Sequence, residues 1–162
     1  MVLKVVRFFG LLLAALTAGL GFCHALELPG KLALAPADWL TAQHTLYNLF
    51  GPTASVSEVG AIVLAWMALV LVRGRQPASL LTLIGAVSLT TALLVWFVVV
   101  DPVNLAVATW TADAIPADWE QFRNRWEFGH MGHAVLLIAG FVALVLAVLA
   151  DTPDRYVWNA KR

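Results

Sequence analysis

The chain has almost no cysteine and little charge, and both shortages exclude classes of protein. Its single cysteine, Cys23, cannot form an internal disulfide or a cysteine-based zinc site. Charged residues make up 12% of the 162 positions, and 10 basic side chains balance 10 acidic ones. Because no run of like charges occurs, the chain lacks the basic surface of a nucleic-acid-binding protein. We therefore expect no nucleic-acid partner.

Apolar residues, in contrast, dominate the chain. They make up 61% of it, and the mean hydropathy of +0.84 is well above that of soluble domains. They gather in four segments, each near the ~20 residues that cross a bilayer, at about 5–26, 55–72, 77–100 and 128–150. Runs of this length without strict alternation predict helices. We expect an all-α fold, a bundle of four transmembrane helices that forms one integral membrane domain over residues 1–162.

The first segment also has features of a signal sequence. Lys4 and Arg7 precede an apolar run that extends from Phe8 to Leu26. This run is longer than an ordinary signal core and long enough to span a bilayer. We interpret it as a retained helix, with cleavage of a signal peptide as the alternative.

The basic residues predict the orientation in the membrane. Most of them would lie on one side: Lys4, Arg7, Arg73, Arg75, Arg155, Lys161 and Arg162. The other side would carry Lys31, Arg123 and Arg125. The positive-inside rule then predicts a multi-pass protein of the inner (plasma) membrane with both termini in the cytoplasm. The two long connections, about residues 29–54 and 101–127, would face outward.

Both long connections contain the tetrapeptide PADW, at residues 36–39 and 116–119. Asp38 and Asp118 are suited to cap short extracytoplasmic helices, one in each connection. Trp39 and Trp119 would then lie at the depth of the membrane interface. Duplication of a helix-loop-helix half and shared capping chemistry are both open explanations of the repeat.

Ionisable residues gather at the outer ends of the predicted spans. They are His24 and Glu27 in the first, Glu58 in the second, Asp101 beside Asn104 after the third, and Glu127, His130 and His133 in the fourth. On a helix, Trp126, His130 and His133 share one face. In a four-helix bundle that face is expected to meet the His24–Glu27 pair in the interior. Because an ionisable group in a membrane is costly, such a polar cluster indicates function.

Three interpretations of this cluster stay open. In the first, His24, Glu27, Glu127, His130 and His133 bind a transition metal, with iron, copper or zinc fitting these ligand types. In the second, no metal is bound and a histidine acts as a general base toward a lipophilic substrate. In the third, Glu127 pairs with Arg123 and the histidines have only structural contacts.

The chain also resembles a known membrane family over nearly its whole length. The similarity lies in HALELPGKLAL and LYNLFG after the first span, DPVN after the third, and RWEFGH at the start of the fourth. These motifs, in this order, resemble the four-helix family that includes anthrone oxygenases and many bacterial proteins of unknown function. The family pattern matches Pro102, Asn104, Trp126 and His130. His133 differs, because members of that family often carry arginine there.

The resemblance implies a four-helix bundle and, for some members, cofactor-independent oxygenation of an anthrone to an anthraquinone. Here His130 or His133 would remove a proton from the substrate, Asn104 would hold the resulting oxyanion, and dioxygen would attack the carbanion. The alternative from another functional class is a non-catalytic accessory subunit of a larger membrane complex, or a homo-oligomer. A small transporter is a third hypothesis, although no ionisable residue lies at mid-depth to continue a pathway.

Overall fold

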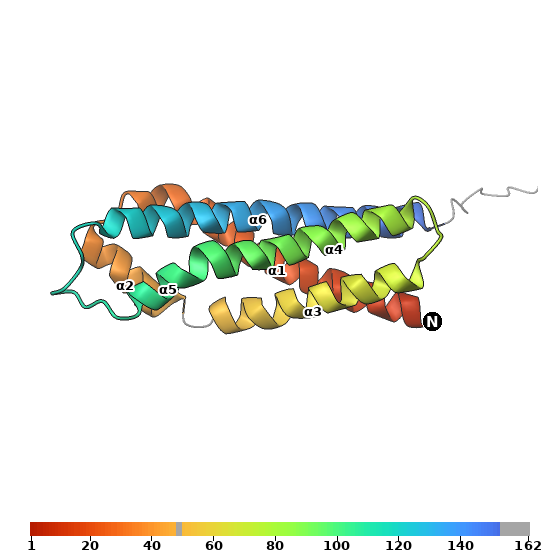
Figure 1. Ribbon diagram of the computed structural model, residues 1–162, viewed down its shortest axis with the longest axis horizontal. Helices are drawn as coiled ribbons and strands as arrows, with labels where there is room; N and C mark the ends of the chain where they lie inside the picture. The colour runs from red at the N-terminus through yellow and green to blue at the C-terminus, as the bar shows by residue number, and fades with distance from the viewer. Residues whose placement is uncertain (48–49, 153–162) are drawn as a thin grey trace, which may run out of the picture.

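The computed structural model describes residues 1–47 and 50–152, and these residues form a long helical bundle (Figure 1). The elements are α1 (Val2–Leu32), α2 (Pro36–Leu46), α3 (Phe50–Leu71), α4 (Ala78–Val95), the π-helical turn η1 (Trp96–Val100), α5 (Asp101–Val107) and α6 (Trp119–Ala150). The α4, η1 and α5 segments follow one another as a single continuous rod. Helix α1 packs against α3 and α6, and α4 packs against the same two helices. The four long elements therefore form a closed ring of neighbours.

The four apolar segments predicted from the sequence are all helical in the structure. Four helical stretches are long and apolar enough to cross a bilayer: Val2–Leu32, Phe50–Leu71, Ala78–Val107 and Trp119–Ala150. The first extends beyond the predicted end, because Pro29 lies inside α1 rather than after it. The connection between α3 and α4 is a tight turn, in which Gly74 has a φ of 81°. That left-handed conformation favours glycine.

Of the two short helices predicted in the long connections, only the first is a separate helix. The first exists as α2, although it begins at Pro36, after Ala35, and Asp38 lies in its first turn instead of capping it. The second is wrong as a separate element, because the residues after Asp118 form the first turns of the continuous helix α6. Asp118 is at the N-cap position of α6 but makes no side-chain capping hydrogen bond. Nothing ends the helix before the apolar segment, so the two merge.

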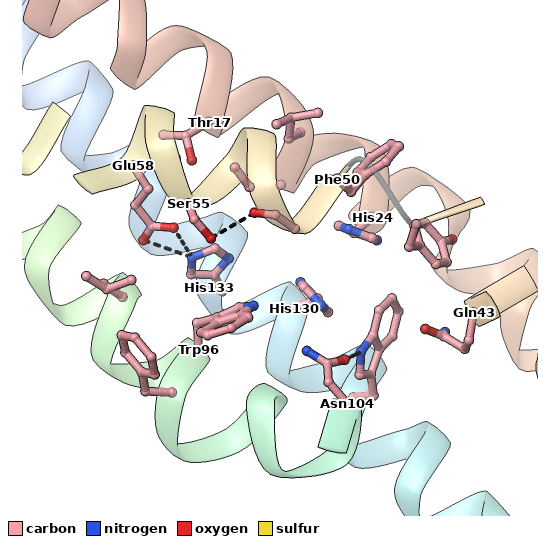
Figure 2. A pocket seen from close by; sticks show the side chains of 18 of the residues that line it. Thr17, His24, Gln43, Phe50, Ser55, Glu58, Trp96, Asn104, His130 and His133 are labelled. Carbon is pink, nitrogen blue, oxygen red and sulfur yellow. Dashed lines mark hydrogen bonds and ion pairs between the residues drawn. The ribbon is translucent and has the colours of Figure 1, made fainter. Parts of the chain in front are cut away.

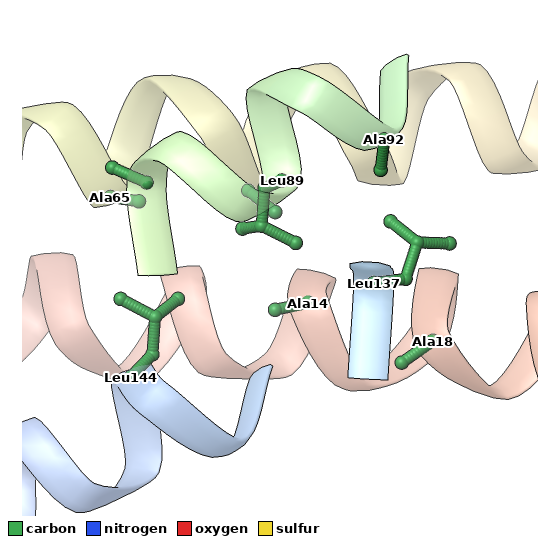
Figure 3. Packing of buried hydrophobic residues seen from close by; sticks show 9 residues of the cluster. Ala14, Ala18, Ala65, Leu89, Ala92, Leu137 and Leu144 are labelled. Carbon is green, nitrogen blue, oxygen red and sulfur yellow. The ribbon is translucent and has the colours of Figure 1, made fainter. Parts of the chain in front are cut away.

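Small side chains let the four helices approach closely. The core contains Ala14 and Ala18 from α1, Ala65 from α3, Ala92 from α4, and three leucines that fill the space between them. Figure 3 shows Leu89 of α4 and Leu137 and Leu144 of α6 among these alanines. Close backbone approach of this kind drives helix association where lipid removes the hydrophobic driving force.

Charged residues fasten one end of the bundle. Arg7 of α1 donates a hydrogen bond of 2.7 Å to Asp151, which follows α6, and Arg75 from the α3–α4 turn lies 3.3 Å from the same carboxylate. The hydrogen bond from Arg7 holds the pKa of Asp151 below its usual value. Asp151 therefore stays ionised over the neutral range and joins three segments at the end where α1 begins and α6 stops.

A π-helical turn lies where the third predicted span was expected to end, at about residue 100. Pro102 has no N–H, so the Val98 carbonyl loses the donor that an α-helix would supply. Arg125 of α6 supplies donors instead, 2.9 Å from the Val98 carbonyl oxygen and 3.1 Å from that of Val99. The chain therefore continues as α5 past the proline and carries Asn104 onward within the bundle.

The glycine contact between α4 and α6 gives a test of this packing. A Cβ added at Gly140 would lie 2.9 Å from two side-chain carbons of Leu89 and 3.3 Å from the Gly85 carbonyl oxygen. Since Leu89 is fully buried, it has no room to move. We expect Gly140→Ala to destabilise the protein by about 1–3 kcal/mol, measured as a lower midpoint of thermal unfolding in detergent.

Gly132 on the same helix is the matched control. Nothing lies within 4 Å of a Cβ added there, so Gly132→Ala should be neutral or stabilising by roughly 0.5–1 kcal/mol through helix propensity. Equal unfolding midpoints for Gly140→Ala and Gly132→Ala would contradict a close contact between α4 and α6 at Gly140.

Candidate functional site

Part of the predicted polar cluster lines a cavity of about 520 Å³: the residues are His24, Glu58, Asn104, His130 and His133, whereas Glu27, Asp101 and Glu127 lie outside the lining. This volume is in the range of small-molecule sites. The cavity lies in the half of the bundle away from Asp151, between α1, α2, α3, α6 and the α4–η1–α5 rod. Its polar lining residues are Thr17, His24, Gln43, His44, Tyr47, Ser55, Glu58, Asn104, His130 and His133, and the rest of the lining is aromatic or aliphatic. Figure 2 shows Glu58 and His133 toward one end, His24 and Asn104 toward the other, and His130 between them.

Glu58 and His133 form a buried pair between α3 and α6. The Nε2 atom of His133 lies 3.0 and 3.1 Å from the two carboxylate oxygens of Glu58. A carboxylate only accepts, so this geometry fixes the proton on Nε2 when the ring is neutral. The lone pair then lies on Nδ1, which is buried without a hydrogen-bond partner among the described residues. His133 is thus an oriented imidazole whose second nitrogen is buried and unpaired among the described residues.

His24 and His130 stack on each other across the interface of α1 and α6. Their ring centroids are 4.2 Å apart and their planes differ by 27°. The Trp126 ring packs 4.2 Å from His130 at 62°. The predicted helical face of Trp126, His130 and His133 therefore does face inward, opposite His24. Over residues 1–47 and 50–152, Nδ1 of His130 is also a buried nitrogen without a partner.

The side-chain amide of Asn104 is oriented by Trp126. The Trp126 indole N–H donates a 2.7 Å hydrogen bond to the Asn104 oxygen, which assigns the oxygen and nitrogen of the amide. In Figure 2 the Asn104 nitrogen lies on the side of the amide away from this bond. Since Asn104 lines the cavity, its N–H groups are donors for a bound molecule.

Lys31 lies beside the cavity, buried near the end of α1. Its ammonium nitrogen is 3.0 Å from the buried carboxylate of Glu127, 3.4 Å from that of Glu27, and 3.4 Å from Nδ1 of His24. It also lies over the Trp126 ring, 4.6 Å from the centroid. The other Glu127 oxygen accepts a hydrogen bond from the Trp39 indole at 3.1 Å. Glu127 therefore pairs with Lys31, and the predicted pairing with Arg123 is wrong.

The second acidic partner of Lys31, Glu27, faces the edge of the bundle. It is 41% exposed and accepts a 2.7 Å hydrogen bond from the Tyr47 hydroxyl. Burial, followed by this hydrogen bond, raises the pKa of Tyr47. The tyrosine therefore stays protonated and remains a donor to Glu27. This contact holds the end of α2 against α1.

The two PADW tryptophans meet at the same end of the bundle. Trp39 and Trp119 have ring centroids 6.2 Å apart, and both belong to a buried cluster with Trp110 and Trp126. The preference of aromatic rings for the membrane interface predicts their depth, and the structure adds that both rings are buried in one cluster. His44 of α2 attaches the same region to α5 by donating to the Val107 carbonyl at 3.1 Å.

The structure divides the five predicted metal ligands into two sets. His130 and His133 line the cavity with His24, whereas Glu27 and Glu127 are outside the lining and bond to Lys31. Over residues 1–47 and 50–152, no three His, Cys, Asp or Glu side chains are arranged to hold a metal ion. The donor set does not fit a metal centre, because an ammonium occupies the position between the carboxylates.

The sequence does not reveal the contacts of two residues at this site, Glu58 and Lys31. Glu58 was expected only as a further carboxylate, yet it orients His133. Lys31 is expected from the sequence only as a basic residue of the outward side, yet it is the counter-ion of Glu127. A signal was present for both: Glu58 lies in the first turns of a span, and a buried carboxylate such as Glu127 requires a cation.

The Lys31–Glu127 pair can be tested by removing one charge. Lys31→Met leaves a buried carboxylate without its counter-ion, so we expect a loss of about 3–5 kcal/mol of stability, read from thermal unfolding in detergent. The double variant Lys31→Met/Glu127→Gln should recover much of it. Glu27→Gln is the control, because that group is partly exposed and its loss should cost no more than about 1 kcal/mol. A harmless Lys31→Met would refute the pairing.

No family model, curated protein or solved structure matches this chain.

Proposed function

We propose that the chain is an intramembrane enzyme of the oxygenase type that acts on a lipophilic, enolisable substrate held in the cavity. The observation that carries the proposal is the His133–Glu58 pair at the wall of a largely apolar cavity. A base oriented by a carboxylate and screened from water is the arrangement that proton abstraction needs. The resemblance to anthrone oxygenases supports the same chemistry.

The first step would be removal of a proton by His133. With Nε2 bonded to Glu58, Nδ1 is the atom that accepts the proton from a substrate C–H or phenol. Glu58 then stabilises the imidazolium through the contact on Nε2, as the third member of a catalytic triad does. The negative charge passes to the substrate oxygen, which the Asn104 amide N–H groups can accept as an oxyanion.

The remaining steps balance without a further reductant. The substrate carbanion adds dioxygen and takes the proton back to give a hydroperoxide. His133 then removes the second hydrogen of the same carbon as a proton, the O–O bond breaks, and water leaves with formation of a ketone. One methylene and one dioxygen thus give one carbonyl and one water, as in the conversion of an anthrone to an anthraquinone.

Dioxygen uptake with anthrone as the probe, in liposomes containing the purified protein, tests this proposal. We expect uptake above the rate of protein-free liposomes. We expect His133→Ala to lower the catalysed rate by about 10²–10⁴-fold, the usual contribution of a general base. Glu58→Gln should lower it less, because the base remains but loses its orienting carboxylate.

Binding of anthraquinone, followed by quenching of tryptophan fluorescence, separates chemistry from folding. His133→Ala should bind anthraquinone as the wild type does, and Glu27→Gln, a carboxylate outside the cavity, should change neither binding nor uptake. Full uptake by His133→Ala would refute the proposed base. Binding without uptake in the wild type would refute oxygenation, and copurification with other subunits would then favour the accessory role.

A further inference from the structure

Cavity-lining residues are exposed on both sides of the seam between α3 and the α4–η1–α5 rod, and His44 of α2 is a further exposed lining residue. Three of the lining residues on α3 are also exposed on the surface: Gly51, Ser55 and Val59. They recur every four residues and so follow one face of the helix. Phe97 and Ala108, on the rod, line the cavity and are exposed in the same way. These two rows of residues are the rims of an opening, which we name the portal.

The packing explains why the opening is there. Helix α3 packs against α1 and α4, and among the described residues it has no comparable packing against η1 or α5. The rod is held instead by α6, where Gly129 allows close approach of η1 and Arg125 bonds its carbonyls. The rod past η1 is therefore attached on the α6 side, and its α3 side is left as the portal.

The surroundings of the portal are apolar on both sides. Val59 and Phe97, on opposite rims, are 48% and 54% exposed, and beside them Val56 and Val98 are 75% and 66% exposed. All four belong to stretches long and apolar enough to span a membrane. An opening bordered by exposed apolar side chains on membrane-spanning helices faces lipid hydrocarbon rather than water.

The lining also limits the charge of what can bind. No lysine or arginine is among the lining residues that the structure describes, so a phosphate or carboxylate would lack a counter-ion. The lining offers uncharged donors instead: the Asn104 amide, whose oxygen accepts from the Trp126 indole, has N–H groups that suit a hydroxyl or carbonyl.

We propose that an uncharged lipophile with a hydroxyl or carbonyl group enters the cavity sideways from the bilayer, through the portal between Val59 and Phe97. The proposal rests on the proposed function in taking the cavity as the substrate site, and it adds the route and the charge class of the substrate. Its test measures occupancy of the cavity and not turnover.

The experiment is photolabelling of the full chain in phosphatidylcholine liposomes. The probe is a long-chain alcohol with a diazirine in its chain, and adducts on the α6 peptide that contains His130 and His133 are measured by mass spectrometry against time. Each initial rate is divided by the final adduct level of the same variant, which corrects for any change in cavity volume. The fatty acid of equal length, ionised at neutral pH, should give few adducts at this peptide.

Substitutions at the rims decide the route. Val59→Trp, which narrows the portal, should slow labelling several-fold. Phe97→Ala, on the opposite rim, widens the portal and should speed labelling. A variant that acts only by filling the cavity would not speed labelling. Val56→Trp is the control, because Val56 faces outward beside the portal and does not line the cavity. His44→Trp tests the other end, where α2 borders the cavity.

Slowing by Val59→Trp alone supports the portal, whereas slowing by His44→Trp alone would overturn it in favour of access from the aqueous end. Equal rates in all variants, or no adducts in the wild type, would also overturn it. Labelling with the expected rim effects but no dioxygen uptake would leave the portal standing and refute only the proposed function.

Discussion

The cavity end of the bundle depends on one buried ammonium group. Lys31 contacts Glu127 of α6, Glu27 and His24 of α1, and the ring of Trp126. A buried carboxylate without a counter-ion would be strongly destabilising, so Glu127 can occupy the interior only because Lys31 reaches it. Through Trp39, the same carboxylate attaches α2. The ion pairs of Lys31 therefore lie next to the histidines, and the charge of Lys31 is neutralised by the two carboxylates instead of binding a ligand.

In the wall of the cavity, His133 and Asn104 each have one polar atom paired and another left unpaired within the part of the chain that the structure describes. Glu58 contacts Nε2 of His133, and the Trp126 indole N–H donates a hydrogen bond to the oxygen of Asn104. Each contact fixes the orientation of a side chain: it leaves Nδ1 of His133 buried without a partner among the described residues and the N–H groups of Asn104 as donors in the cavity wall. Such one-sided pairing differs from a purely structural network, in which every buried polar group is satisfied. This difference is the main physical support for a binding role.

Much of this arrangement followed from the sequence. The length of the apolar runs predicted the four spans, and helical spacing predicted that Trp126, His130 and His133 share an inward face, because both depend only on helix geometry. What failed depended on contacts between distant segments. The third span was expected to end at about residue 100, but the helix continues past Pro102 because Arg125 replaces the lost donor, and that pairing has no local signature. The same holds for Lys31 and Glu127, which are far apart in sequence and meet only once the ring of helices closes.

The π-helical turn has a consequence for how such a site changes over evolution. A π turn holds one residue more than an α-helical turn, and each residue advances a helix by about 100°. The π turn absorbs that extra residue locally, so loss of a single codon within Trp96–Val100 would restore a regular α-helix and leave the residues after it in nearly the same rotational phase. Asn104 would then stay on the cavity side, whereas a deletion elsewhere in the rod would rotate it away by about 100°. The π turn is therefore the place where this wall of the cavity can gain or lose one residue without a change of the face that it presents.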